Sequence, residues 1–390
     1  MTSDSMSDTM AGTTKGVAAK KPARGKRARV VLFFLAVLAI IAYRPAHQHA
    51  RAASLLVSFS DKNAKPNVTD ERTTFDVNGE QVAARIYTPA GVSDPPSVVL
   101  VHGVNHFGID DPRLERFARA VSAAGVQVMT PAVKELSDYH VAPHSIDTVG
   151  GALMEMQRRN HVSRVGLMGM SFGGGVSLLA AADERFADRV SFVVAVGAHA
   201  DLGRVSRFFV TDEVARPDGS VEHLKAHGYG MMILVYTHVE DFFPAADVPA
   251  AREAMRLWIW EHRDEARKIE ATCSAACKEK LDRLFGEGAE IYRPEMLALI
   301  DRHANDMAKV SPHGRLGTIR ANVYLLHGAG DTVIPATETE WLAQEVPAKR
   351  LKTTLITPAL EHVDLKDPSA ADKWALVHFM GRVIGEADAQ

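Results

Sequence analysis

From Thr73 onward, the apolar positions of the chain alternate between short strand-like runs and longer helix-like runs. The first two strand-like runs, Thr73–Val77 and Gln81–Tyr87, flank Asn78-Gly79, which is the strongest short signal for a hairpin. The next run, Ser97–Val101 (SVVLV), is apolar throughout, as in strands of a parallel sheet that is covered on both faces. The pattern therefore predicts an antiparallel pair that leads into a parallel sheet.

The alternation continues and predicts a doubly wound, mostly parallel α/β sheet. Strands are expected at Val126–Thr130, Arg164–Met170, Arg189–Val196, Asn322–Leu326 and Lys352–Ile356, and helices at Pro112–Ala124, Ser145–Arg159, Phe172–Ala182, Ala336–Gln344 and Ser369–Ile384. Right-handed crossovers between such elements place helices on both faces of the sheet. The core is thus expected in two parts, residues 71–199 and residues 321–390.

Residues 200–320 show helical rather than strand patterning and predict an inserted helical cap. Their large apolar side chains have two interpretations. They fill a small core of the cap itself, or some of them line an acyl or aromatic pocket above the site. These side chains are Phe208, Phe209, Met231, Met232, Phe242, Phe243, Trp258 and Trp260.

The first 70 residues predict a membrane segment with a basic tail before it. Residues 1–29 are polar, carry seven lysines and arginines, and are expected to be disordered. Val30–Tyr43 holds no charge, Gly or Pro, so residues 30–44 predict a transmembrane or signal anchor; a cleaved secretion signal and a buried core helix are the alternatives. Because the basic flank stays in the cytoplasm, the body is expected on the non-cytoplasmic side, periplasmic or extracellular. Residues 45–70 are expected to form a linker.

The composition indicates a folded protein and gives no support for nucleic-acid binding. The chain has 390 residues, of which 46% are hydrophobic and 24% charged, so a large folded body is expected. The net charge of -3 provides no positive field for nucleic acid, which favours a small-molecule partner. Cys273 and Cys277 have no matching His or Cys pair nearby, so no zinc site is expected there, and one local disulfide remains open.

The segment Gly169-Met170-Ser171-Phe172-Gly173 has the pattern G-x-S-x-G between a predicted strand and a predicted helix. A nucleophile on so tight a turn needs glycines two residues before and after it, because larger side chains would collide. Ser171 is therefore the predicted nucleophile, and the alternative is a small-residue packing turn. The backbone N–H of Phe172 is a predicted oxyanion donor, and Val104, after His102-Gly103, is predicted to supply the second.

Two further residues are placed by topology to complete a triad. Asp331 follows the strand Asn322–Leu326, at the sheet edge where a carboxylate can orient an imidazole; helix capping is the alternative role. Among the 17 histidines, His362 alone follows the last predicted strand and precedes the last predicted helix. It is therefore the predicted general base. His102 is expected to be structural.

Together, the hairpin, the His102-Gly103 turn, the Ser171 elbow, the Asp331 loop and His362 resemble the α/β-hydrolase superfamily. The likeness covers about residues 73–199 and 320–387. Within the superfamily, the chain looks most like serine esterases near the dienelactone-hydrolase and prolyl-oligopeptidase-like groups. The resemblance implies acyl transfer with Ser171 as nucleophile, His362 as base and Asp331 as orienting acid.

The sequence thus predicts a membrane-anchored serine hydrolase that cleaves a carboxylic ester through an acyl-enzyme intermediate. The membrane contact is expected through residues 30–43, and neither a metal nor an organic cofactor is expected. A peptidase or an acyltransferase would use the same triad. A non-catalytic binding or scaffold protein on a hydrolase fold is the remaining alternative.

Overall fold

The computed structural model describes Met1, Gly12 and residues 24–362, 364–365 and 369–390, without the side chains of 24–41 and 364–365. The chain divides into two units, Met1–Ala46 and His47–Gln390. Helix α1 (Arg24–Ser60) begins in the first unit. Most of the basic tail predicted to be disordered lies outside the described residues, and the backbone of Arg24–Arg29 is helical.

The predicted anchor, residues 30–44, falls within the backbone of α1, and the side chains of its first twelve residues lie outside the described part of the chain. Among the described residues, no helix combines the length and the apolar character that crossing a membrane requires.

The second unit is built on one sheet of eight strands, in the order β1-β2-β4-β3-β5-β6-β9-β10. The strands are β1 (Val68–Val77), β2 (Glu80–Pro89), β3 (Ser97–Val101), β4 (Gln127–Pro131), β5 (Val165–Met170), β6 (Val190–Val196), β9 (Asn322–Gly328) and β10 (Leu351–Thr357). Strand β2 runs antiparallel to both its neighbours, and every pair from β4 to β10 is parallel. The predicted doubly wound α/β sheet is confirmed.

The opening hairpin turns at Asn78 and Gly79, whose φ angles of 53° and 88° are both in the left-handed region. A two-residue hairpin loop that follows the strand twist requires this conformation at both positions. The predicted hairpin is therefore present, and its first strand begins at Val68, five residues before the predicted start at Thr73.

The two faces of the sheet are covered by separate layers of helices. In β3, Val99 and Val101 join the buried cluster on one face, whereas Val98 and Leu100 join the cluster on the other. This alternation follows from the two-residue period of a strand, and it explains why the run is apolar throughout. The helices α4 (Pro143–Asn160) and α5 (Phe172–Ala182) cover the first face, and α2 (Pro112–Ala123) and α15 (Ala370–Ala387) cover the second.

Residues 45–60, predicted as part of a linker, are helical, and this prediction is wrong. In the second unit, Ala52, Leu55 and Phe59 of α1 are buried in the cluster with α2 and α15. Arg51 binds the ends of the same two helices, since its Nη1 donates to Asp388 after α15 at 2.8 and 2.7 Å and its Nε donates to the carbonyl of Ala124 after α2 at 2.6 Å. An i, i+3, i+7 apolar spacing identifies this face in retrospect.

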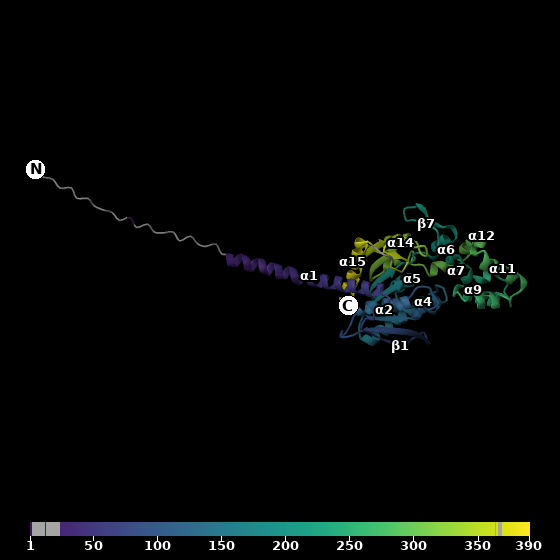
Figure 1. The fold of residues 1–390 in the computed structure, drawn as a ribbon, viewed down its shortest axis with the longest axis horizontal. Coiled ribbons are helices and arrows are strands. Elements are labelled where there is room, and N and C mark those ends of the chain that lie inside the picture. Colours follow the sequence, from purple (N-terminus) through teal and green to yellow (C-terminus); the bar gives the residue numbers. More distant parts are fainter. Residues whose placement is uncertain (2–11, 13–23, 363, 366–368) are drawn as a thin grey trace. The chain divides into compact units, whose positions relative to one another are not determined.

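Between β6 and β9 the chain forms a helical insertion that also carries a small hairpin. Its elements are α6 (Leu202–Thr211), β7 (Glu213–Ala215), β8 (Val221–His223), α7 (Tyr229–Thr237), α8 (Val239–Phe242), α9 (Val248–Ile259), α10 (Arg263–Glu270), α11 (Ala275–Gly286), α12 (Arg293–Arg302) and α13 (Ala304–Lys309). Figure 1 shows the labelled helices of this insertion gathered at one side of the second unit. Its apolar residues are continuous with the cluster on the α4–α5 face of the sheet.

Helix α14 (Thr337–Glu345) follows β9 and matches the helix predicted at Ala336–Gln344. Three further elements were not predicted from the sequence pattern: α3 (Lys134–Ser137) and the two-residue strands β11 (Leu360–Glu361) and β12 (Asp364–Leu365). The β11–β12 pair matters for function, because its turn carries His362.

Candidate active site

Ser171 lies on the turn between β5 and α5, in a conformation that few residues adopt. Its φ and ψ are 54° and −133°. Such a backbone costs about 1–3 kcal/mol and persists only where the surroundings impose it. Here the amide of Ser171 donates to the carbonyl of Val196 at 2.7 Å, and its carbonyl accepts from the amide of Gly174 at 2.8 Å. The elbow is thus held by hydrogen bonds on both sides.

The glycines of the motif are required by close approach. A Cβ on Gly169 would lie 2.3 Å from the carbonyl oxygen of Gly173, and a Cβ on Gly173 would lie 2.2 Å from the carbonyl oxygen of His102. Both obstacles are backbone atoms, which cannot move aside as a flexible side chain can. The sequence argument for a tight strand-to-helix turn therefore matches the local packing.

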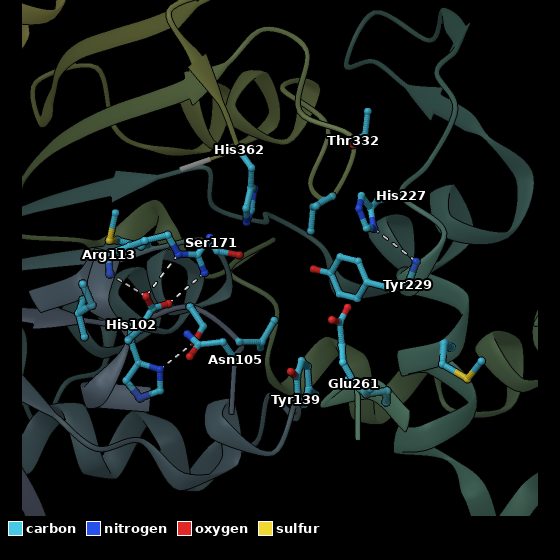
Figure 2. Close-up of a pocket in the computed structure, with 18 of the residues that line it drawn as sticks. His102, Asn105, Arg113, Tyr139, Ser171, His227, Tyr229, Glu261, Thr332 and His362 are labelled. Atoms are coloured by element: carbon cyan, nitrogen blue, oxygen red, sulfur yellow. Dashed lines mark hydrogen bonds and ion pairs between the residues drawn. The ribbon is translucent and has the colours of Figure 1, made fainter. Parts of the chain in front are cut away.

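The three predicted triad residues come from three loops that follow β5, β9 and β10. Nδ1 of His362 donates to Oδ2 of Asp331 at 2.6 Å. That bond leaves Nε2 of His362 as an acceptor, the tautomer a general base needs. Ser171 and His362 line the same pocket (Figure 2). Among the described residues Ser171 Oγ has no hydrogen-bond partner, and catalytic contacts of this kind often tighten only with substrate.

Asp331 is fully buried, and both its oxygens are engaged. Oδ1 accepts from the amides of Val333 at 2.8 Å and Ile334 at 3.0 Å. Burial alone would raise the pKa of Asp331, but hydrogen bonding from His327 and His362 outweighs burial and holds this pKa well below its usual range. The carboxylate is therefore ionised across the physiological range and can stabilise a positive charge on His362.

His327 is the second imidazole beside Asp331, and the sequence analysis gave it no role. Its Nε2 lies 3.4 Å from Asp331 Oδ2 and donates to the carbonyl of Ile334 at 2.8 Å, while its Nδ1 pairs with Thr339 Oγ1 at 2.7 Å. The ring is fully buried. His327 thus holds the loop of Asp331 through its contacts with Ile334 and with the Asp331 carboxylate, and it is a positioning residue.

The predicted oxyanion donors lie on the two turns next to Ser171. The amide of Phe172 opens α5, and the first amides of a helix have no partner within the helix. The turn at Gly103 and Val104 approaches closely, because a Cβ on Gly103 would lie 3.0 Å from the Cβ of Ser171. The positions fit, and the assignment of these two amides to an oxyanion hole stays a prediction.

His102 has the structural role expected of it. The ring is buried, its Nε2 accepts from the amide of Val133 at 3.1 Å, and its Nδ1 donates to the carbonyl of Gly103 at 2.7 Å. Burial lowers the pKa of His102, so the ring is neutral. It joins the end of β3 to the loop after β4 and shapes the turn that carries Val104.

The pocket around Ser171 has a volume of about 810 Å³ and is lined from both the core and the cap. The cap contributes His227, Tyr229, Met232, Trp258, Glu261 and Arg263, and the core contributes Asn105, Arg113, Tyr139 and Glu361 among others (Figure 2). Burial raises the pKa of the Tyr229 and Tyr139 hydroxyls, which are therefore neutral. Neither tyrosine was singled out from the sequence, because Tyr139 reaches the site from the segment after α3 and Tyr229 from the cap, and neither position has a local signal.

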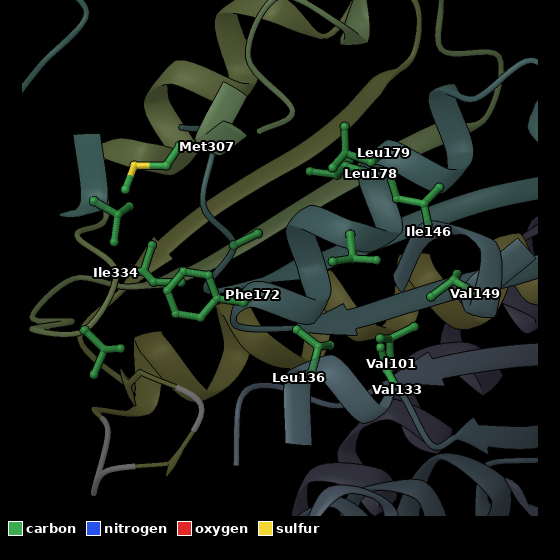
Figure 3. Packing of buried hydrophobic residues seen from close by; sticks show 14 of the residues in the cluster. Val101, Val133, Leu136, Ile146, Val149, Phe172, Leu178, Leu179, Met307 and Ile334 are labelled. Atoms are coloured by element: carbon green, nitrogen blue, oxygen red, sulfur yellow. The ribbon is translucent and has the colours of Figure 1, made fainter. Parts of the chain in front are cut away.

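A second, mostly apolar cavity of about 150 Å³ adjoins the predicted oxyanion donors. Val104, Tyr139, Phe172 and Tyr229 line it, together with apolar side chains of the cap: Leu202, Phe209, Ile233, Leu234, Met307 and Val310. Phe172 belongs to the large buried cluster that also holds Met307 and Ile334 (Figure 3). Val104, Tyr139 and Tyr229 line both cavities, so the two share a boundary beside Ser171.

The apolar cap residues divide between a buried cluster and the pocket walls. Most of them are buried, and the cluster they join is continuous with the core on the α4–α5 face of the sheet, so the expectation of a separate small core in the cap is wrong; these residues are Phe208, Phe209, Met231, Phe242 and Phe243. Met232 and Trp258 line the large pocket, and Phe209 lines the smaller cavity as well. Trp260 stacks on His106 at a centroid distance of 5.1 Å. The insertion therefore supplies both part of the core and pocket walls.

Cys273 and Cys277 are both free thiols. They lie near Asp247, whose carboxylate accepts from the amide and the hydroxyl of Ser274 at 3.0 and 2.6 Å. Ser274 in turn caps α11, since its Oγ accepts from the amide of Cys277. Asp247 is thus occupied in holding the start of this helix.

The strand order with one antiparallel strand second from the edge, the Ser171 elbow after β5, and the chain order Ser, Asp, His define the α/β-hydrolase fold. The α/β-hydrolase fold that the sequence predicts is therefore confirmed.

Comparison with known proteins gives distant structural likenesses. No family model and no curated protein matches the sequence. The chain is similar to 2,6-dihydroxy-pseudo-oxynicotine hydrolase, with 14% identity, 80% of this chain and 67% of that one covered, and a TM-score of 0.44. It is also similar to dienelactone hydrolase from Anabaena variabilis, with 14% identity, 81% of this chain and 96% of that one covered, and a TM-score of 0.41. A third similar structure is an acylaminoacyl peptidase, with 11% identity, 83% of this chain and 42% of that one covered, and a TM-score of 0.47. The chain thus spans less than half of that peptidase.

Proposed function

We propose that the protein is a serine hydrolase that cleaves carboxylic esters through an acyl-enzyme intermediate. The observation that carries the proposal is the bond from His362 Nδ1 to the buried Asp331, in the pocket that holds the strained Ser171. This combination activates a nucleophile, and a turn required only for packing has no need of a buried, ionised carboxylate behind a histidine.

The reaction proceeds in two steps. His362 Nε2 takes the proton of Ser171 Oγ as that oxygen attacks the ester carbonyl, and the amides of Phe172 and Val104 bind the resulting oxyanion. The imidazolium then gives its proton to the departing alcohol. In the second step His362 takes a proton from water, and the hydroxide attacks the acyl-enzyme. The imidazolium then returns this proton to the departing Oγ of Ser171, so that the carboxylic acid and free Ser171 are released.

The 150 Å³ cavity indicates the acyl group. Its walls are mostly apolar, it meets the predicted oxyanion donors Val104 and Phe172, and it shares Tyr139 and Tyr229 with the large pocket. An apolar cavity of this volume holds roughly a benzene-sized group. We therefore propose short acyl chains of about four to six carbons, or a benzoyl group.

The larger pocket fits the alcohol part of the ester. Its volume of about 810 Å³ exceeds that of the side cavity several-fold, and its lining includes Arg113, Glu261, Arg263 and Glu361. Charged and hydrogen-bonding groups of this kind favour a sizeable polar leaving group. The neutral hydroxyls of Tyr139 and Tyr229 stand where they can donate to it.

The test is hydrolysis of nitrophenyl esters of increasing acyl length by the full chain and by Ser171→Ala. Rates are expected to peak at about four to six carbons and to vanish in the variant. Ile233→Trp, which fills the side cavity from α7, is expected to shift the optimum to acetate, whereas the matched change Val221→Trp on the exposed β8 is not. If the preferred acyl length is the same in Ile233→Trp as in the wild type, the side cavity does not hold the acyl group. Cleavage of peptide amides in preference to esters would favour a peptidase, and transfer to an added alcohol would favour an acyltransferase.

We also propose that residues 30–43 hold the protein at a membrane, with the body on the non-cytoplasmic side. The support is the uncharged run Val30–Tyr43 directly after seven positive charges. Cell fractionation of the full chain tests the attachment, and protease accessibility in intact spheroplasts tests the side. Recovery of the full chain in the soluble fraction without processing would contradict the proposal.

A further inference from the structure

We propose that the cap contains a binding site for a zinc-like divalent cation, formed by His238, Asp241 and His303, apart from the active site. One ligand atom from each of the three lies within 4.8 Å of the others. His238 and Asp241 are close in sequence, whereas His303 lies 62 residues beyond Asp241 and meets them because α12 and α13 pack beside α7 and α8 in the folded cap.

The three residues sit at helix junctions. His238 separates α7 from α8, Asp241 is on α8, and His303 separates α12 from α13. A cation bound here would join two pairs of short helices that Asp241 already links through hydrogen bonds with Arg302 and His303. A site of this kind contributes its binding free energy to the stability of the folded cap.

The geometry brings the ligands close to the arrangement that a cation needs. Nε2 of His303 lies 2.7 Å from Oδ2 of Asp241, and the rings of His238 and His303 are 4.4 Å apart between centroids, with 33° between their planes. Tetrahedral zinc with bonds of about 2.0–2.1 Å keeps its ligand atoms roughly 3.3 Å apart. Small side-chain rotations from the observed positions therefore suffice.

The ligand types also fit. Two imidazoles and one carboxylate, with water in the fourth position, form a common zinc ligand set, and this set suits zinc better than calcium or magnesium, which prefer oxygen.

Neighbouring charges support the arrangement. Arg302 Nη1 donates to Oδ1 of Asp241, which leaves Oδ2 directed at His303. On the other side of the His303 ring, Oδ2 of Asp306 lies 3.9 Å from Nδ1, which is beyond hydrogen-bond distance, while its Oδ1 accepts from Lys309 at 2.7 Å. A carboxylate that moves into contact with this nitrogen orients a metal-bound imidazole and raises its basicity. Asp306 is the residue placed to take this role when a cation is bound.

The site borders the proposed acyl cavity. His238 and Asp306 line the same 150 Å³ cavity as Phe172 and Val104. A bound cation would thus fix the wall of the cavity formed by α7 and α13. The proposal does not depend on the hydrolase activity, and its test needs no substrate.

The test is a titration of the untagged full chain with cobalt(II), followed by visible absorption and by competition with zinc. One cobalt per chain with a tetrahedral spectrum is expected, together with a higher melting temperature. His303→Ala and the nearly isosteric Asp241→Asn are expected to weaken binding at least tenfold, and Asp306→Asn by roughly tenfold. His223→Ala, an exposed histidine of β8, is the matched control and is expected to bind as the wild type does.

Two results would overturn the site. One is the absence of saturable cobalt or zinc binding by the wild type. The other is binding that Asp241→Asn and His303→Ala leave unchanged. Melting curves recorded without metal show whether each variant is folded, and Asp241→Asn keeps the test decisive if a histidine variant is not, because Asp241 is exposed.

Discussion

Nδ1 of His362 donates to Oδ2 of Asp331 over 2.6 Å, and the same carboxylate oxygen lies 3.4 Å from Nε2 of His327. The buried Asp331 carboxylate therefore orients His362, the proposed base, while His327 holds the carboxylate itself in place. Most of the chemistry proposed for this protein depends on that arrangement.

Replacing Asp331 by Asn is expected to keep the fold and to remove nearly all activity. An amide at this position can donate to His362 Nδ1 and thereby favours the wrong tautomer of the ring. The kcat for a nitrophenyl ester should fall by roughly 10⁴-fold, with a smaller change in KM. Steady-state kinetics at pH 7.5 is the measurement, and a loss of less than tenfold would show that Asp331 does not orient the base.

Asp331 also makes stability depend on pH in a defined direction. Its pKa is held below the usual range, so the unfolded state, with a pKa of about 3.9, binds the proton more tightly. The stabilisation is fully present above about pH 4 and is lost as the pH falls further. Urea unfolding at pH 6 and pH 3 should therefore show a smaller pH effect in Asp331→Asn than in the wild type. If the free energy of unfolding falls by the same amount between pH 6 and pH 3 in both proteins, Asp331 is not the source of this pH dependence.

The elbow makes a separate prediction about Gly173. Gly173→Ala places a Cβ 2.2 Å from the carbonyl oxygen of His102, so the turn must move and the activity should be lost together with stability. Gly286→Ala, at the end of α11, meets nothing within 4 Å and is the control. Melting temperature and ester hydrolysis are measured for both variants. A Gly173→Ala protein that is as stable and as active as the wild type would show that Gly173 does not lie as close to the carbonyl of His102 as described.

The second half of α1 should be an integral part of the folded body. Leu55 is 2% exposed, and Leu55→Ala is expected to lower the free energy of unfolding by about 2–5 kcal/mol. Val57, two residues further, is 67% exposed, and Val57→Ala should change stability by less than about 0.5 kcal/mol. Chemical denaturation of the pair measures the difference. Equal effects would mean that this helix does not pack as described.

The sheet and the loops that carry the three proposed triad residues could be predicted because each depends on local patterns or on chain order. The run Ser97–Val101 has the uniform apolar character of a strand covered on both faces, and Ser171 stands between glycines that the turn requires. Asp331 and His362 follow from chain order alone. The helix over residues 45–60 was missed because its buried residues, Ala52, Leu55 and Phe59, are spaced among polar ones and follow a proline.

The pocket walls could not be predicted from the sequence for a physical reason. Tyr139 and Tyr229 reach the site from the loop after β4 and from the cap, and neither position has a local signal. The cluster of His238, Asp241 and His303 likewise has no fixed spacing along the chain. Contacts of this kind depend on how helices pack, and packing is not encoded by period or motif.

Labelling of the full chain with a fluorophosphonate tests directly whether Ser171 is an activated nucleophile, because this reagent reacts with an activated serine whatever the substrate. Stoichiometric labelling of the wild type is expected, located on Ser171 by peptide mass spectrometry, together with loss of labelling in Ser171→Ala and His362→Ala. Ser206→Ala, at a buried serine beside the acyl cavity, should label normally. A folded wild type that does not react, or one that still reacts after Ser171→Ala, would contradict the account.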